Sequence, residues 1–180
     1  MRPTVRSCGL ICEVALLLAV AYDAGAQTIA VGNGWGVQGE TASVPVTLTA
    51  SADYTAVLAR LEYDATALVN PSAAGGPLLA AAHALDFHSP QPGRVNVAVY
   101  PDSGMPAFTA QTGVLFTLSF DILPTARLGQ SAIGFTTAGT PALPTSDLTD
   151  TTGAVALHQT RPGWVLVRGA TTVRPWMLYE

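Results

Sequence analysis

An alternating run near the middle of the chain restricts the possible fold more than any other feature. Over residues 113–122, apolar side chains occupy every second position, and most of the side chains between them are polar. This period of two is typical of a β-strand that buries one face. Pro124 ends the run, because proline has no N–H to donate to a sheet. We expect an inner face of Phe116, Leu118, Phe120 and Ile122, and an outer face of Leu115, Thr117, Ser119 and Asp121.

Short runs of the same kind recur along the chain and are separated by turn-forming residues. The 180 residues are enough for one domain with a sizeable core, and only 11% of them are charged. The sequence therefore predicts an all-β, antiparallel sandwich of about nine strands, of jelly-roll or Greek-key type. The expected strands are residues 28–31, 42–50, 56–63, 84–89, 94–100, 113–122, 132–136, 154–158 and 163–167.

Two segments between these strands are predicted to be irregular. Residues 32–34, Gly-Asn-Gly, form a turn that ends the first strand, so Trp35 lies in a Gly-rich turn. Residues 70–83 are rich in Ala, Gly and Pro and form a loop with one helical turn at most. Pro45 interrupts the second expected strand, which places that strand at a sheet edge or a bulge.

The N-terminus has the features of a targeting segment. Arg2 and Arg6 supply positive charge, an apolar run follows over residues 14–21, and Ala24-Gly25-Ala26 has the small residues of a cleavage site. This pattern predicts a secretory signal peptide that is cleaved after Ala26, so that the protein is secreted, extracellular or periplasmic. The apolar run is too short for a stable membrane span, and an uncleaved anchor is the alternative.

Both cysteines, Cys8 and Cys12, lie inside this targeting segment. A mature chain that starts at Gln27 therefore contains no cysteine, and its stability depends on its core rather than on disulfides. We expect three parts: a signal peptide at residues 1–26, a sandwich at residues 27–169 and a C-terminal tail at residues 170–180.

Charge and motif content argue against several classes of function. The net charge is −4 and the arginines are scattered, which disfavours a nucleic-acid partner. No nucleophile elbow, zinc-protease motif or phosphate-binding loop occurs. The sequence thus predicts no enzyme, no cofactor and no metal. The nearest approaches to a metal site are His83, Asp86 and His88, whose spacing matches no metal motif, and Asp147 with Asp150, whose spacing is that of a turn rather than a calcium loop.

Aromatic residues leave a carbohydrate-binding function open. Surfaces that bind flat polysaccharides present a row of exposed rings that stack on sugar faces. Such a row would have to be built from Trp35, Tyr54, Tyr100 and Trp164.

Several motifs, taken in order, resemble cohesin domains, the receptor modules of cellulosome scaffolds. A Gly-Glu-Thr segment precedes an alternating Val-Pro-Val strand over residues 39–46, and a later strand ends in Tyr63-Asp64 with Leu68 shortly after. A further strand leads into Asp102-Ser103-Gly104. The last motif is Gly-Val-Leu-Phe with alternation up to Pro124. The resemblance covers residues 28–168, and family 3 carbohydrate-binding modules share a related sandwich.

The resemblance implies a protein partner rather than chemistry. In cohesins one sheet face receives dockerin, a small calcium-loaded helical module, and the resemblance implies that residues 56–63, 94–100 and 113–122 form that face. An apolar centre with a polar rim and an aromatic anchor suits such an interface. The implied contact residues are Leu58, Arg60, Glu62, Asn96, Ala98, Tyr100, Leu115, Thr117 and Ser119.

One pair of positions departs from the best-known pattern. Type I cohesins carry Asn and Asp at the positions matching Ala56 and Leu58, where these polar groups recognise a Ser-Thr pair in dockerin. The partner is therefore expected to be a divergent dockerin or a different protein, in an extracellular or surface assembly linked to polysaccharide degradation. A carbohydrate-binding module and a structural domain of the envelope or matrix are the alternatives.

Overall fold

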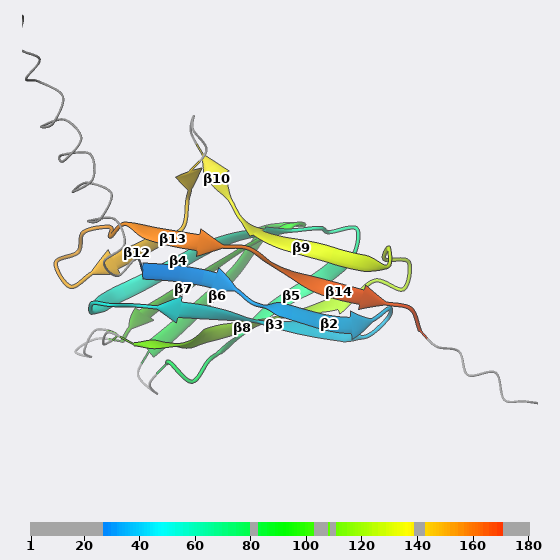
Figure 1. Cartoon of the computed structure of the whole chain (residues 1–180), viewed down its shortest axis with the longest axis horizontal. Coiled ribbons are helices and arrows are strands. Elements are labelled where there is room, and N and C mark those ends of the chain that lie inside the picture. Colours follow the sequence, from blue (N-terminus) through cyan, green and yellow to red (C-terminus); the bar gives the residue numbers. More distant parts are fainter. Residues whose placement is uncertain (1–26, 80–82, 103–107, 109–110, 139–142, 171–180) are drawn as a thin grey trace, which may run out of the picture.

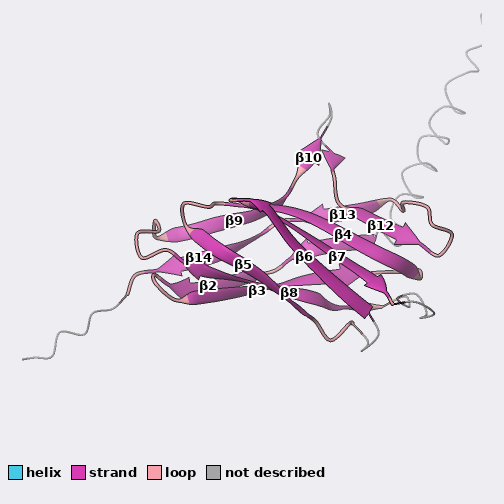
Figure 2. Cartoon of the chain, turned by 180° about the vertical axis from the view of Figure 1, so that it is seen from behind, coloured by secondary structure: helices cyan, strands magenta, loops and turns pink. Residues whose placement is uncertain are grey.

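The computed structural model describes residues 27–79, 83–102, 108, 111–138 and 143–170. The expected signal peptide at residues 1–26 and nearly all of the expected tail lie outside these residues. Within the described residues the chain forms two sheets that pack face to face, with a small hairpin that stands out from them (Figures 1 and 2). The predicted all-β sandwich is thus confirmed.

The first sheet has five strands in the order β13-β1-β3-β8-β5. All of its pairs are antiparallel except β1 with β13, which are parallel. Its strands are β13 (His158–Arg161), β1 (Gln27–Val31), β3 (Thr41–Thr49), β8 (Thr112–Ile122) and β5 (Leu68–Gly75).

The second sheet has the order β2-β14-β9-β4-β7-β6, and β12 pairs with the part of β4 that β9 does not reach. Here β14 and β2 are parallel. Its strands are β2 (Asn33–Val37), β14 (Gly163–Arg168), β9 (Gly129–Phe135), β4 (Tyr54–Tyr63), β7 (Arg94–Pro101), β6 (His83–Gln91) and β12 (Asp147–Asp150). The separate hairpin consists of β10 (Thr137–Ala138) and β11 (Leu143–Pro144).

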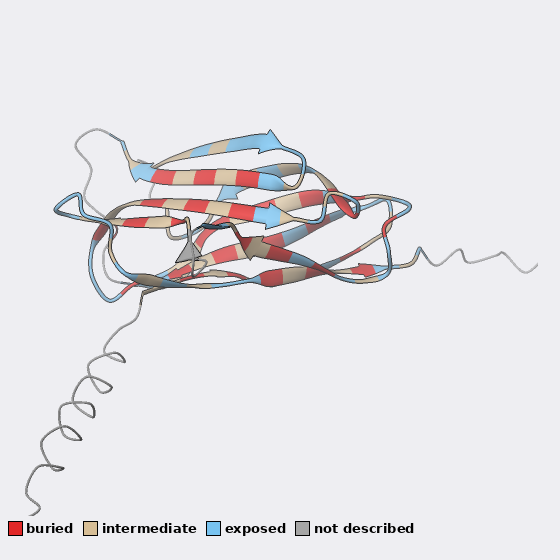
Figure 3. Cartoon of the chain, turned by 90° about the horizontal axis from the view of Figure 1, so that it is seen from above, coloured by how far each residue is buried: buried red, intermediate tan, exposed pale blue. Residues whose placement is uncertain are grey.

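The core lies between the two sheets and follows the predicted alternation. Buried and less buried residues alternate along most strands (Figure 3). The expected inner residues of β8, from Phe116 to Ile122, are all at most 2% exposed. The ring of Phe120 contacts the ring of Tyr63 from the opposite sheet, with centroids 5.0 Å apart. Such contacts across the sandwich remove a large apolar area from water, which is the main force that holds the two sheets together.

One residue of β8 does not follow the alternation. The register between β3 and β8 shifts at Val46, so that Phe116 lies opposite Val46 and Val114 lies opposite Thr47. Leu115 is the extra residue of this β-bulge, and both Leu115 and Phe116 are fully buried. The prediction that Leu115 faces outward is therefore wrong. The expectation for Pro45 was a strand at a sheet edge or a bulge: β3 is an inner strand of its sheet, and the register shift begins one residue after Pro45.

The chain crosses from one sheet to the other at Gly32. Its N–H donates to the carbonyl oxygen of Pro45 at 2.7 Å, and β2 then pairs with β14 in the second sheet. A Cβ at Gly32 would lie 2.7 Å from the Pro45 ring, so the crossing needs glycine. The predicted turn at residues 32–34 is therefore wrong, and Trp35 lies in a strand.

Three other predicted boundaries also differ. The expected loop at residues 70–83 begins with β5, which is held to β8 by long-range pairing that no local pattern reveals. The turn expected over Asp147, Asp150 and Gly153 is found only from Asp150 to Gly153, and Asp147 lies in β12. The strand expected at residues 154–158 begins only at His158. Among the described residues, no helix is long and apolar enough to span a membrane.

Candidate partner-binding surface

The nine predicted contact residues do not share one surface. Six of them lie on β4 and β7, which are paired strands of the second sheet. The other three, Leu115, Thr117 and Ser119, lie on β8 in the first sheet, on the opposite side of the sandwich. Alternation tells which face of a strand is buried, but it does not tell which sheet the strand joins. The expected three-strand face is therefore wrong for β8.

The six residues on β4 and β7 lie on the outer face of their sheet, where strands β6 and β12 extend the surface on either side. Residues that face each other in antiparallel strands point to the same side. We call this surface the β4 face. It consists of Ala56, Leu58, Arg60, Glu62, Asp86, His88, Arg94, Asn96, Ala98, Tyr100, Asp147 and Thr149.

The middle of the β4 face is an apolar pair between two carboxylates. Leu58 lies opposite Ala98, with Asp147 of β12 next to Leu58 and Asp86 of β6 next to Ala98. The strand register thus produces the row Asp147, Leu58, Ala98, Asp86 across four strands. An apolar centre with polar groups at its rim is the usual composition of a protein interface.

Asp147 is held by Arg60. The guanidinium of Arg60 lies 3.1 Å from the Asp147 carboxylate and also donates to the carbonyl oxygen of Thr145. The backbone N–H of Arg60 donates to Ser146 Oγ at 3.0 Å. The side chains of Arg60 and Asp147 are 35% and 38% exposed, so the ion pair itself adds little to stability. Its effect is to fix the positions of both groups on the β4 face.

Asp86 is held by Tyr100 in a similar way. The Tyr100 hydroxyl donates to the Asp86 carboxylate at 3.0 Å, and the Tyr100 ring is 38% exposed. This hydrogen bond and the nearby negative charge raise the pKa of Tyr100, so the phenol keeps its proton. Both carboxylates of the central row are therefore oriented before any partner arrives.

A groove lies beside this row, at the base of the β10–β11 hairpin. It has a volume of about 560 Å³. The hairpin leaves the sheet after β9 and returns as β12, and Figures 1 and 2 show it projecting from the sandwich. The groove is lined by Arg60, Pro90, Arg94, Asn96, Thr136, Thr137, Ala138 and Thr145.

Several residues of the β4 face were not found by sequence reasoning. Asp147 was interpreted as part of a turn, and Asp86, His88, Arg94 and Thr149 were not among the predicted contact residues. The signal for β12 is only the short alternation around buried Leu148. Their positions depend on pairing between strands that are far apart in sequence, which a local pattern does not contain.

The histidine cluster is not formed, and the four candidate sugar-binding rings do not all lie together on one surface. Asp86 and His88 lie on the β4 face, whereas His83 is on the opposite face of β6 and stacks on Phe108 with ring centroids 4.2 Å apart. Among the described residues no group of three potential metal ligands is found. Of the four proposed sugar-binding rings, Tyr54 is only 2% exposed, which excludes it from a surface platform.

Comparison with known proteins identifies the family. The sequence matches the model of the cohesin domain family over residues 28–160. No curated protein matches this sequence significantly. The fold is similar to the sixth cohesin of scaffoldin B from Acetivibrio cellulolyticus, solved in complex with a dockerin, with a TM-score of 0.66 and 19% identity over 79% of this chain and 99% of that chain.

Two further solved structures have the same fold. One is a cohesin from Clostridium acetobutylicum, with a TM-score of 0.62 and 21% identity over 79% of this chain and 90% of that chain. The other is a non-cellulosomal cohesin from the archaeon Archaeoglobus fulgidus, with a TM-score of 0.60 and 19% identity over 79% of this chain and 91% of that chain. The family match over most of the chain, together with this shared sandwich, shows that the protein belongs to the cohesin domain family, whose members are non-catalytic binding modules.

Proposed function

We propose that this protein is a secreted module that binds a dockerin-like protein through its β4 face. The observation that carries the proposal is the central row of that face, in which the pair Leu58 and Ala98 lies between Asp147 and Asp86. An apolar centre can be covered by an apolar side of a partner, while the flanking carboxylates select donors or cations.

Preorganisation of this row supports the proposal. Arg60 holds Asp147 and Tyr100 holds Asp86, so less side-chain freedom is lost when a partner binds. The outer face of the first sheet, on the other side of the sandwich, has a different composition. It is rich in Ser and Thr, and its polar groups bond to one another, as in the 2.8 Å contact between Ser43 and Ser119.

The chemistry of the central row also suggests which kind of dockerin to expect. The positions that match the Asn and Asp of type I cohesins are Ala56 and Leu58, whose cross-strand neighbours are Thr149 and Asp147. The polar groups at this place thus come from β12 instead of β4. We therefore expect a partner with an apolar contact over Leu58 and a donor or cation near Asp147, rather than a Ser-Thr pair alone.

The cellular setting is part of the same proposal. Cleavage after Ala26 would leave β1 intact, because β1 begins at Gln27. An exported cohesin would then act in an extracellular or surface assembly, and a polysaccharide-degrading assembly is one such setting. Among the similar structures, one cohesin is described as non-cellulosomal, so the proposal is defined by the partner protein and not by a polysaccharide.

Binding to the dockerins of the same organism tests the proposal. Calcium-loaded recombinant dockerin modules are titrated against the intact chain by calorimetry. We expect at least one to bind, and Leu58→Asp to weaken that binding by about 30-fold or more, the loss typical of an interface hot spot. The physical reason is that a third carboxylate would be buried between Asp147 and Asp86 without a partner.

Thr117→Asp is the matched control, because it introduces the same charge on β8 at a similarly part-buried position of the opposite sheet. We expect its affinity to equal that of the unmodified chain. Circular dichroism of both variants verifies that they fold. Failure of every dockerin to bind, or a loss on Thr117→Asp with none on Leu58→Asp, would reject the proposed surface.

A further inference from the structure

The sheet that carries the β4 face has a second surface with large apolar side chains. This surface lies at the opposite end of the sheet, on strands β2 and β14. Trp35 on β2 is 60% exposed, and Leu128, which directly precedes β9, is 57% exposed. Trp164 and Leu166 of β14 are partly buried beside them. We call this surface the Trp35 patch: Trp35, Val37, Leu128, Trp164, Leu166 and Arg168.

The strand register places these residues on one side. In β14, Val165 and Val167 are buried in the core, so Trp164, Leu166 and Arg168 point outward. Trp35 lies opposite Leu166, and Val37 lies opposite Arg168. Glycines at positions 34 and 36 face the core, because a Cβ there would meet Ser43 and Ile122. The patch is thus a continuous part of the outer surface and not a set of scattered side chains.

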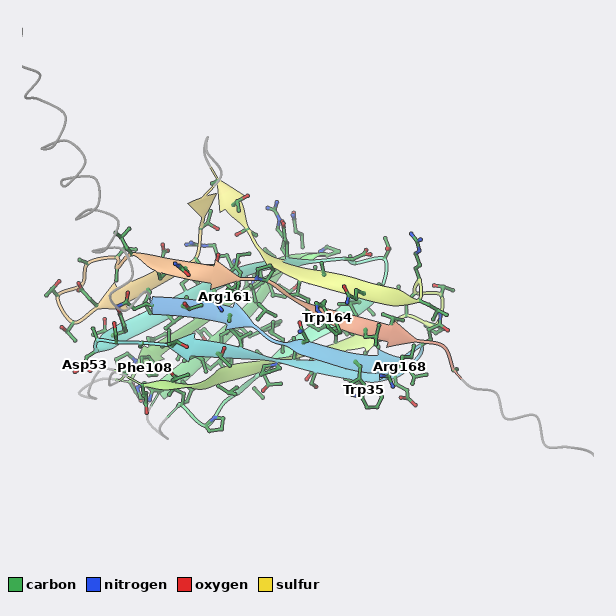
Figure 4. All side chains as sticks on the ribbon, viewed as in Figure 1. Trp35, Asp53, Phe108, Arg161, Trp164 and Arg168 are labelled. Atoms are coloured by element: carbon green, nitrogen blue, oxygen red, sulfur yellow. The ribbon has the colours of Figure 1, made fainter. Side chains whose placement is uncertain are left out.

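Arg168 links the patch to the place where the chain leaves it. Its guanidinium lies over the Trp35 ring, 4.8 Å from the ring centroid. The next residue, Gly169, lies beside Leu128: a Cβ at Gly169 would be in van der Waals contact with that side chain, at 3.7 Å. Figure 4 shows Trp35 and Arg168 together at the end of β14. The chain therefore exits from within the patch.

The backbone around this exit is held in place. The N–H of Gln38 donates to the carbonyl oxygen of Arg168 at 2.9 Å, and Gln38 Nε2 donates to the carbonyl oxygen of Ala126 at 2.7 Å. These bonds join the end of β2 to the end of β14 and to the segment before β9. The Trp35 patch is a preformed surface, and large exposed apolar patches of this kind usually have an occupant.

We propose that the occupant is the chain's own segment at residues 171–180, which packs its apolar side chains over the Trp35 patch. This segment contains Trp176, Met177, Leu178 and Tyr179 in succession. It follows Ala170 directly, so it is tethered to the patch by its own backbone. Tethering gives the segment an effective concentration in the mM range at the patch. A contact with the tethered segment is therefore favoured over weak binding of another molecule from solution.

The geometry permits this contact. An extended chain advances about 3.3 Å per residue, so Trp176 reaches about 20 Å from Ala170. Trp35 lies opposite Leu166, only two residues before Arg168 along β14. The segment can therefore turn back and place an aromatic ring over Trp35. Strand β9 lies between the Trp35 patch and the β4 face in the same sheet. The contact of the segment with the patch is therefore independent of partner binding at the β4 face.

Tryptophan fluorescence of the intact chain tests the contact. The chain has three tryptophans. Trp176→Phe keeps an apolar ring in the segment and leaves Trp35 and Trp164 as the only emitters. In that background we expect Leu178→Ser to raise the acrylamide quenching constant of the emission by about two-fold, because the Trp35 patch becomes more accessible to the quencher.

Leu157→Ser in the same background is the matched control, since Leu157 is 88% exposed and lies outside the patch. It should leave quenching unchanged. The proposal is overturned if Leu178→Ser has no effect, or if the protection of Trp35 depends on protein concentration, which would point to a second copy. Protection that appears only when cello-oligosaccharide is added would also overturn it in favour of a sugar ligand.

Discussion

Single carboxylates organise the turns of this sandwich at places where the strand ladders end. Asp64 accepts hydrogen bonds from the N–H and hydroxyl of Thr66, at 2.8 and 2.6 Å. Asp150 does the same for Thr152 and also accepts from the N–H of Ala154 at 3.0 Å. These hydrogen bonds satisfy donors that the backbone leaves unpaired in a tight turn.

The turn at Asp150 should make stability depend on pH. Hydrogen bonds from Thr152 and Ala154 lower the pKa of Asp150 below its ordinary value of 3.8. The unfolded chain therefore takes up the proton first, so the stabilisation is fully present above about pH 5 and is lost as the pH falls through the folded-state pKa. We expect Asp150→Asn, which keeps the acceptor oxygen, to lose less stability between pH 5 and pH 3 than the unmodified chain does.

Urea unfolding at several pH values measures this difference. The same substitution at Asp53, an exposed carboxylate outside this turn, is the control. If the stability of Asp150→Asn and that of the unmodified chain depend equally on pH, protonation of Asp150 does not cause the loss of stability at low pH.

At the scale of elements, the hairpin β10–β11 interrupts what would otherwise be one strand beside β4. Arg60 binds both ends of the interruption. Its carbonyl oxygen accepts from the N–H of Thr136 at 3.0 Å, and its guanidinium bonds to Thr145 and Asp147 on the return. One residue of β4 thus fixes where the hairpin leaves the sheet and where it rejoins it.

Loss of the Arg60 guanidinium should loosen β12 without affecting the core. Arg60→Met keeps the apolar stem but removes the donors to Thr145 and Asp147. The exposed ion pair with Asp147 contributes little, and the hydrogen bond to the Thr145 carbonyl is worth about 1 kcal/mol, so amide hydrogen exchange in β12 should accelerate by about five-fold. Amides of β7 should be unchanged.

Arg94→Met is the control for this measurement, because Arg94 lies on the same face opposite Glu62 but away from β12. Exchange in β12 that is the same in both variants would show that Arg60 does not hold the strand.

At the scale of the whole molecule, closure of the sandwich depends on a tight crossing of backbones. Gly163 begins β14 beside Gly32, where β1 passes into β2. A Cβ at Gly163 would lie 2.1 Å from the carbonyl oxygen of Gly32 and 2.6 Å from that of Val31. Two backbones can approach this closely only where no side chain separates them.

Gly163→Ala should therefore destabilise the fold by about 1–3 kcal/mol, the usual cost of overpacking, because backbone atoms would have to move. Chemical denaturation measures the change. Gly134→Ala is the matched control, since its nearest neighbour is the flexible Glu62 side chain at 3.9 Å. A Gly163→Ala chain as stable as the Gly134→Ala chain would show that the crossing tolerates a side chain.

Local pattern was sufficient for strands such as β4, β7 and β8 and for most of their buried residues, but not for β2, β5 and β12. The alternation in β4, β7 and β8 predicted core residues such as Leu61, Val97 and Phe120, all of which are fully buried. The order of motifs also predicted the cohesin family, which the family match confirms. These features depend on which residue types follow one another, and that information is present in the sequence itself.

The tertiary structure alone decided which strands share a surface. Period two separates the inner and outer sides of a strand, but it carries no information on which sheet the strand joins. Strands pair through backbone N–H and C=O groups, which are the same in every residue except proline. For this reason Thr117 and Ser119 were placed on the wrong face, and Asp147 was missed. The bulge at Leu115 and the crossing at Gly32 likewise arise from long-range pairing, so the binding surface became visible only once the two sheets were assembled.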